Sequence, residues 1–529
     1  MNLARALGSI GGLTLVSRVL ALVRDTLQAS YVGASFASDA FFVAFRLPNM
    51  FRALFAEGAF SAAFIPLFNR KVAEGGGTAA GVDFAERALA LLFPVLVVVT
   101  ALMLVAAWPL TWGLSLGFRH QHPSAEQFAF AVTLSRFTIP YLLLISLVSL
   151  LGGILNSLHR FWVNAAAPIL LNIAMVGALI FFHGDDPYET ARAQAISVTV
   201  GGALQLAWLW WACRRAGVRL ALRRPRIDDD VKQMLKLIVP AATGAGAAQI
   251  NLAISTALAG GLLSAGSISA IYYADRLNQL PLGLIGIGLG TILLPVVSRL
   301  LSEGRDAEAM ETQNRGLELA LFLTLPATAA FVFAAEPIVR GLFQHGVFDA
   351  GDTIRSAQAL AAFSLGLPSY VLVKVLTPGF YARADTRTPV RLALYSVAIN
   401  LIGNLILIPT LAHWDVGHIG PPLATALASS VNVASLYVVL ARRGHFALDP
   451  QVKRKLPRLA LSALLMGAAL LLVAPFVEPY LTGALPVRGA ALAVLVGAGV
   501  AIYAVACFVT GAYRLDDLRS LLRRRATTR

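Results

Sequence analysis

The chain has 529 residues, of which 57% are hydrophobic and only 13% are charged, and its mean hydropathy is +0.72. Soluble domains carry about 25% charged residues, so this composition excludes an ordinary soluble enzyme and indicates an all-α polytopic membrane protein. The formal net charge of +15 would favour nucleic-acid binding in a soluble protein. Here the Lys and Arg residues gather beside apolar segments, so we expect contact with membrane lipids and no nucleic-acid partner.

Apolar segments long enough to cross a bilayer recur along the whole chain. We count about fourteen predicted transmembrane helices, with mostly short loops between them. Their approximate bounds are 8–31, 36–69, 85–116, 127–157, 161–183, 190–213, 231–263, 267–301, 314–336, 354–382, 387–411, 419–441, 456–477 and 486–511. Cytoplasmic loops are enriched in Lys and Arg, and the basic segments 214–236, 442–458 and 514–529 therefore place both termini in the cytoplasm.

An internal repeat divides these segments into two sets. The string AFRLPN around Arg46 resembles ADRLNQ around Arg276, 230 positions later, while Pro66 and Pro295 lie 229 positions apart. We therefore predict two six-helix lobes related by a parallel repeat, an arrangement of transporters that bind their substrate between the lobes. The predicted parts are an N-terminal lobe at 1–225, a C-terminal lobe at 226–445, an additional helix pair at 446–512 and a basic cytoplasmic tail at 513–529.

Five arginines interrupt the apolar segments, although a charge at the centre of a spanning helix costs about 2.5–3.5 kcal/mol. They are Arg18, Arg24, Arg46, Arg52 and Arg276. Charged residues at this depth usually face a water-filled cavity, and the common sign of these five indicates an anionic ligand. The guanidinium fork matches phosphate oxygens and stays charged when desolvated, which favours a pyrophosphate. The alternative is structural ion pairing between helices, with no ligand.

Polar residues accompany these arginines in the second predicted span. Helical spacing places Asp39, Arg46 and Glu57 on one stripe, where the two carboxylates would pair with arginines in an empty cavity. The same spacing places Asn49 about one turn from Arg52.

Similar pairs occur elsewhere along the chain. In the first span, Arg18 and Asp25 are expected on one face, with Arg24 pointing elsewhere. In the second lobe, Asp275 adjoins Arg276, and Ser269 lies about two turns earlier. Asp275 either belongs to the cavity or pairs locally with a neighbouring helix.

Asn400 and Asn404 lie on one face of the eleventh span. They either join helices by hydrogen bonds or offer oxygen ligands to a coupling sodium ion. The glycines between Gly283 and Gly290 favour a close-packing seam. We find no nucleophile–base pair, metal cluster or ATP-binding motif in the sequence, so we expect a transporter without a cofactor, whose coupling ion, Na⁺ or H⁺, is left open.

Several long strings resemble a known family. They are SRVLALVRD at 17–25, SDAFFVAFRLPNMFRALFAEGAFSAAFIP at 38–66, YYADRL at 272–277, GTILLPVVS at 290–298 and PGFYARADTRTPVR at 378–391. In these strings the chain is similar to the bacterial lipid II flippases of the MurJ (MviN) family, within the broader group of drug, oligosaccharide-lipid and polysaccharide exporters. The resemblance extends over essentially the whole chain, including the additional C-terminal helix pair.

The resemblance implies which residues bind the substrate. The family's essential positions match Arg18, Arg24, Asp39, Arg52 and Arg276. Secondary positions match Ser17, Asn49, Glu57, Ser269 and Asp275. Gln279 departs from the acidic residue expected in relatives, and the additional helix pair is expected to form a groove for the lipid tail.

The function implied is that of a flippase. Lipid II, which is undecaprenyl-pyrophosphate carrying the disaccharide-pentapeptide of peptidoglycan, would cross the bacterial inner membrane from the cytoplasmic to the periplasmic leaflet by alternating access. The cell-wall synthesis machinery is an expected partner. The alternatives are a related polysaccharide-lipid or drug exporter and a non-transporting membrane scaffold for cell-wall synthesis.

Overall fold

The computed structural model describes residues 3–55 and 59–513, and every regular element within them is a helix. Packing divides the chain into two compact units. The first comprises Met1–Ser269 with the short segment Gly346–Phe348, and the second comprises Ala270–His345 with Asp349–Arg529. This grouping reflects packing alone, so the repeat-based lobe boundaries at 225 and 445 stay a prediction.

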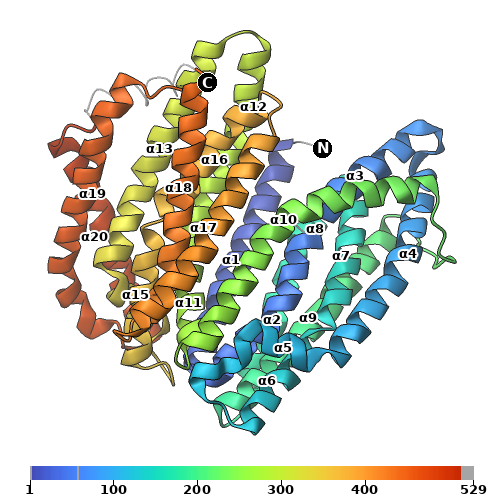
Figure 1. Cartoon of the computed structure of the whole chain (residues 1–529), viewed down its shortest axis with the longest axis horizontal. Helices are drawn as coiled ribbons and strands as arrows, with labels where there is room; N and C mark the ends of the chain where they lie inside the picture. The colour runs from blue at the N-terminus through green and yellow to red at the C-terminus, as the bar shows by residue number, and fades with distance from the viewer. Residues whose placement is uncertain (1–2, 56–58, 514–529) are drawn as a thin grey trace. The chain divides into compact units, whose positions relative to one another are not determined.

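The first unit contains ten α-helices, counted over the described residues (Figure 1). They are α1 (Leu3–Val32), α2 (Phe36–Phe55), α3 (Ala59–Lys71), α4 (Gly77–Val105), α5 (Ala107–Ser115), α6 (Ala125–Thr138), α7 (Tyr141–Ser157), α8 (Phe161–Phe181), α9 (Pro187–Arg215) and α10 (Asp229–Leu262). A π-helical turn, η1 (Val72–Gly76), joins α3 to α4, and a 3₁₀ segment, η2 (Leu116–Gln121), follows α5. Helix α8 packs against both α1 and α9, and this contact positions the first part of the site.

Helix α11 (Ser267–Pro281) begins in the first unit and continues into the second. A π-helical turn, η3 (Leu282–Gly286), connects it to α12 (Ile287–Ser302). The remaining α-helices of the second unit are α13 (Asp306–Phe333), α14 (Ala335–Phe343), α15 (Ala350–Ser364), α16 (Leu367–Tyr381), α17 (Arg387–Ala412), α18 (Gly420–Arg442), α19 (Pro450–Val477) and α20 (Leu485–Val509). A short 3₁₀ turn, η4 (Gly417–Ile419), precedes α18, and another, η5 (Glu478–Tyr480), follows α19.

Eleven helical segments of the described chain are long and apolar enough to cross a membrane. They are Gly77–Val105, Ala125–Ser157, Phe161–Phe181, Pro187–Arg215, Ser267–Ser302, Asp306–Phe333, Ala350–Tyr381, Arg387–Ala412, Gly417–Arg442, Pro450–Tyr480 and Leu485–Val509. Each corresponds to one of the predicted spans. The predicted spans 8–31, 36–69 and 231–263 are not among the eleven, and the first two contain most of the intramembrane charge. The count of fourteen stays a prediction.

Helix α10 packs within the first unit. Asp228 caps its N-terminus by accepting a hydrogen bond from the amide of Val231 at 2.9 Å. At its other end, Gly260 and Gly261 let the backbone approach the end of α5 and the start of η2. A Cβ on Gly260 would come within 2.8 Å of the carbonyl oxygen of Ser115. Glycine is therefore required at this close approach between α10 and the end of α5.

The additional C-terminal pair, α19 and α20, packs on α13 in the second unit (red in Figure 1). Gly467 in α19 faces the ring of Phe333, and a Cβ there would come within 2.3 Å of that ring. The hydroxyl of Tyr503 in α20 donates to the carbonyl oxygen of Phe322 at 3.0 Å. These contacts join the pair to the body of the second unit.

Candidate functional site

Arg24 is almost fully buried between α1 and α8, with 6% of its surface exposed. Its Nε and Nη2 donate to Oδ1 of Asp25 at 3.0 and 2.7 Å. Its Nη1 donates to Oδ1 of Asn172 at 3.1 Å and lies 3.7 Å from the sulfur of Met175. The fork of the guanidinium group therefore bonds to both helices, which is an arrangement that a lysine cannot reproduce.

This pairing corrects one expectation. Helical spacing placed Asp25 on the face of Arg18, whereas the structure pairs it with its neighbour Arg24. The reason is the length of the arginine side chain, which folds back along the helix to reach an adjacent carboxylate. Arg18 is half-exposed, and no acidic side chain in the described residues lies within ion-pair distance of it.

Ser17 belongs to the same contact. The amide Nδ2 of Asn172 donates to the carbonyl oxygen of Ser17 at 3.1 Å and lies 3.5 Å from its hydroxyl. Asn172 thus bonds to α1 at two points, through Ser17 and through Arg24. Asn172 could not be selected from the sequence, because a single asparagine in an apolar span carries no spacing signal.

Each arginine of α2 donates to a polar side chain. Nη2 of Arg46 donates to the hydroxyl of Thr256 in α10 at 2.7 Å. Nε of Arg52 donates to Oδ1 of Asn49 at 3.0 Å, which confirms the predicted proximity of these two residues. Both arginines are half-buried. Glu57 lies outside the described residues.

Asp39 is fully buried, and its bonds differ from the arginine pairing that the sequence favoured. Its Oδ1 accepts from the amide and the hydroxyl of Ser269 at 2.8 and 2.5 Å. Its Oδ2 accepts from the amide of Gly266 at 2.8 Å and from the side chain of Gln121 at 3.2 Å. The carboxylate therefore caps the N-terminus of α11, where free amide groups and the helix dipole stabilise a negative charge.

In the second unit, Arg276 lies in α11 and folds back on Tyr272. Its Nε and Nη2 donate to the Tyr272 hydroxyl at 2.9 and 2.7 Å, and its Cζ lies 4.8 Å from the centre of the ring. One turn after Asp275, the side chain of Gln279 donates to Oδ2 of Asp275 at 2.5 Å. Tyr272 is thus a positioning residue that sequence reasoning missed, although it lies in the YYADRL string.

A lysine that the sequence reasoning passed over lines a hollow of the second unit. Lys374, in α16, is exposed beside a cavity of about 440 Å³, together with Gly286, Gly290 and Asn432. Gly286 and Gly290 line this hollow. A Cβ on Gly290 would lie 3.7 Å from the Cβ of Lys374. The close-packing seam predicted for the glycines between Gly283 and Gly290 stays a prediction. A lone lysine inside the apolar segment 354–382 was the available signal.

The two asparagines of α17 bond to each other and to α18. Nδ2 of Asn404 donates to Oδ1 of Asn400 at 2.9 Å, and Nδ2 of Asn400 donates to the hydroxyl of Thr425 at 3.0 Å. These bonds are the helix-joining arrangement that the sequence favoured over sodium ligation. Among the described residues, no group of three or more His, Cys, Asp and Glu side chains could hold a metal ion.

Comparison with known proteins gives a consistent result. A family model described as lipid II flippase MurJ matches residues 28–491. A probable lipid II flippase MurJ of Rhizobium tropici is 40% identical over 530 residues, covering 99% of this chain and 97% of that protein. The lipid II flippase MurJ of Burkholderia cenocepacia is 36% identical over 479 residues, covering 88% and 89% of the two chains.

Two solved structures show the same fold. A lipid II flippase MurJ in an inward closed conformation matches with a TM-score of 0.75 at 23% identity, covering 94% of this chain and 98% of that chain. An inward-facing multidrug transporter of the MATE family matches with a TM-score of 0.66 at 16% identity, covering 80% and 94%. The spanning helices and the relatives together identify a multi-pass membrane protein of a transporter family.

Proposed function

Because the chain belongs to the lipid II flippase MurJ family, we propose that it moves lipid II from the cytoplasmic to the periplasmic leaflet of the bacterial inner membrane. The headgroup would enter a cavity lined by arginines, and alternating access would deliver it to the other side while the tail stays in lipid. Both termini would lie in the cytoplasm, as the distribution of basic residues indicates.

The observation that carries this proposal is the charge of the first two helices. The described residues of α1 and α2 include the half-exposed or buried arginines Arg18, Arg24, Arg46 and Arg52, but only two acidic side chains within these spans, Asp25 and Asp39. Asp39 is used to cap α11. The positive excess supports an anionic ligand such as a pyrophosphate, whose oxygens fit the guanidinium fork.

The bonds of Arg24 suggest how the ligand engages. A pyrophosphate would compete with Asp25 and Asn172 for the same donors, so binding would loosen the contact between α1 and α8. Tyr272 would hold the guanidinium of Arg276 in one orientation until the substrate arrives. Asp39 would not touch the substrate in this arrangement, because it is fully buried beneath the start of α11.

Two other functions remain as alternatives to test. A polysaccharide-lipid or drug exporter would share the fold, as the multidrug transporter structure does, but the positive excess disfavours a cationic drug. A non-transporting scaffold that assembles cell-wall synthesis enzymes would need no arginine excess inside the membrane. We infer that the membrane potential supplies net drive, and that any coupling to Na⁺ or H⁺ is additional.

The proposal is tested by reconstituting the full chain in vesicles that contain lipid II and measuring how much of it becomes accessible in the opposite leaflet. Transport that falls at least tenfold in the Arg24→Ala/Asp25→Ala double variant, with vesicle incorporation unchanged, supports the arginine site. Equal transport of a neutral glycolipid that lacks the pyrophosphate would contradict it. Depletion in cells with no accumulation of lipid II in the cytoplasmic leaflet would favour the scaffold.

A further inference from the structure

The end of α9 and the linker after it form a second polar site in the first unit. Helix α9 ends at Arg215, and Gly217 turns the chain with a φ of +80°, so that the amide of Val218 donates to the carbonyl oxygen of Cys213 at 3.0 Å. From there to Ile227 the linker has no helix or strand. Its course is fixed by packing instead.

Side chains of α4 hold the linker in place. Glu86 accepts a hydrogen bond from the amide of Ala221 at 2.9 Å and pairs with Nη2 of Arg223 at 2.6 Å. Asp83 pairs with Nη1 of Arg223 at 2.6 Å. The linker is thereby positioned beside α7 and α9, and the space between them is a defined hollow.

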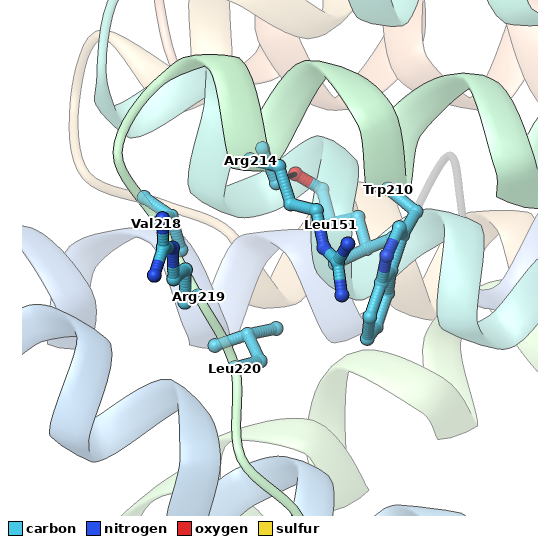
Figure 2. A pocket seen from close by; sticks show the side chains of 7 residues that line it. Leu151, Trp210, Arg214, Val218, Arg219 and Leu220 are labelled. Carbon is cyan, nitrogen blue, oxygen red and sulfur yellow. Dashed lines mark hydrogen bonds between the residues drawn. The ribbon is translucent and has the colours of Figure 1, made fainter.

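Figure 2 shows this hollow, with Arg214 and Arg219 on two sides of it. The rest of the lining is Leu151, Trp210, Cys213, Val218 and Leu220. Its volume is about 380 Å³. A second hollow of about 230 Å³ shares the side chains of Leu151, Trp210 and Leu220 with the first. The second hollow continues along α4 and α7, and only apolar side chains line it.

The two arginines that line the first hollow differ in their ion pairing from Arg223, which follows them in the linker. No acidic side chain in the described residues lies within ion-pair distance of Arg214 or Arg219. Arg223, by contrast, is neutralised by Asp83 and Glu86. Arg214 lies over the Trp210 ring, with its Cζ 5.3 Å from the ring centre, which fixes its position without removing its charge.

We propose that this place binds one anionic phospholipid. The phosphodiester group lies between Arg214 and Arg219, and one acyl chain occupies the apolar hollow against Leu147 and Phe93. Guanidinium groups suit phosphate oxygens, and a tryptophan beside basic residues is typical of the membrane–water interface. The end of α9 is expected on the cytoplasmic side, where the leaflet is anionic.

The apolar hollow distinguishes this ligand from a free anion, since phosphate alone would leave that surface unfilled. The basic C-terminal segment 514–529 is positively charged, as are Arg214 and Arg219. The two arginines would therefore repel this segment, and it is a poor candidate to fill the hollow. A lipid bound here would join the linker to α7 and α9. This inference does not depend on the transport of lipid II.

The test is native mass spectrometry of the full-length purified protein titrated with phosphatidylglycerol, with phosphatidylcholine as the zwitterionic reference. The Arg214→Gln/Arg219→Gln variant is expected to lower the affinity for the first phosphatidylglycerol at least tenfold. The matched control, Arg215→Gln/Arg224→Gln, removes the same charge from residues that do not line the hollow, and it is expected to change the affinity less than twofold.

A second variant tests the apolar hollow without altering charge. Leu147→Trp fills it, and phosphatidylglycerol binding should fall while binding of inorganic phosphate does not change. Equal losses in the two arginine double variants would overturn the proposal in favour of general surface charge. Displacement of the lipid by millimolar inorganic phosphate alone would show a free-anion site, and tighter binding of undecaprenyl phosphate would show a substrate site. Both of these outcomes would also overturn the proposal.

Discussion

Asp39 and Ser269 are joined by two hydrogen bonds, of 2.8 Å from the amide and 2.5 Å from the hydroxyl of Ser269. The two residues are 230 positions apart, which is the spacing of Arg46 and Arg276 in the predicted repeat. The bond fixes the first turn of α11, and Arg276 lies about two turns further along the same helix. Asp39 is therefore a positioning residue for the helix that carries this arginine.

We expect Asp39→Ala to lower both thermal stability and transport. It leaves the buried amide of Ser269 and its hydroxyl without an acceptor, at a cost of about 1–3 kcal/mol for each orphaned group. Ser269→Ala removes one donor and leaves the carboxylate bonded to the two amides, so its effect should be smaller. The measurements are the midpoint of thermal denaturation in detergent and the rate of transport in vesicles. An Asp39→Ala protein with unaltered stability and no transport would instead assign Asp39 to the substrate.

The Arg24–Asp25 pair separates stability from ligand binding. Arg24→Ala leaves the Asp25 carboxylate buried, with 2% of its surface exposed, and should destabilise the protein by about 3–5 kcal/mol. The double variant Arg24→Ala/Asp25→Ala should recover most of that stability but not transport. Arg24→Lys keeps the positive charge but loses the guanidinium group, which donates to both Asp25 and Asn172. Only part of the transport activity should therefore remain. Full transport by the double variant would remove Arg24 from the binding site.

The contact between α19 and α13 can be tested with a matched pair of glycines. Gly467→Val forces a methyl-bearing carbon into the ring of Phe333, whereas a Cβ on Gly497 in α20 meets nothing within 4 Å. Gly467→Val should therefore separate the additional helix pair from α13 and lower both thermal stability and transport, while Gly497→Val should not. Normal transport by a chain truncated before α19 would show that this pair has no part in moving the lipid.

The membrane potential should set the transport rate. Arg18, Arg24, Arg46 and Arg52, set against Asp25 and Asp39, give this part of α1 and α2 a charge of about +2 with standard ionisation. Moving one charge through the whole field is worth about 2.3 kcal/mol per 100 mV. A potential that is negative on the cytoplasmic side favours the inward return of the empty, positive site. Vesicles with potassium gradients and valinomycin provide this potential. Equal rates at zero and negative potential, with stimulation by a sodium or proton gradient alone, would assign the drive to an ion.

The loop residue His345 should make the second unit sensitive to acid. Burial, assisted by Arg488, lowers the pKa of His345 to about 4. The unfolded chain binds a proton near pH 6.5 and the folded chain does not, so stability is fully present above pH 6.5 and declines as the pH falls towards about 4. His345→Gln should flatten this dependence of the denaturation midpoint on pH. A slope in His345→Gln equal to that of the original chain would contradict this explanation.

Local spacing in the sequence predicted only part of the site. Asn49 and Arg52 are three residues apart on one helix, and periodicity was sufficient to bring them together. The partners of Asp39 were not predictable in this way, because they are backbone amides of a helix that begins far along the chain. The pairing of Arg24 with Asp25 was missed because helical projection ignores how far an arginine can bend. The all-helical fold and most of the spans followed from hydropathy, which reports burial in lipid directly.

The π-helical turn η3 governs the packing that follows it. A turn of this kind contains about one residue more than a regular α-helical turn, so it rotates the downstream face by roughly 100°. Leu293 in α12 packs where a Cβ on Gly316 in α13 would come within 2.9 Å of it. Deleting one residue from Leu282–Gly286 would preserve a continuous helix and yet turn Leu293 away from this contact. The chain is therefore more sensitive to a single-residue deletion here than to most substitutions, because α12 would be out of register with α13 over its whole length.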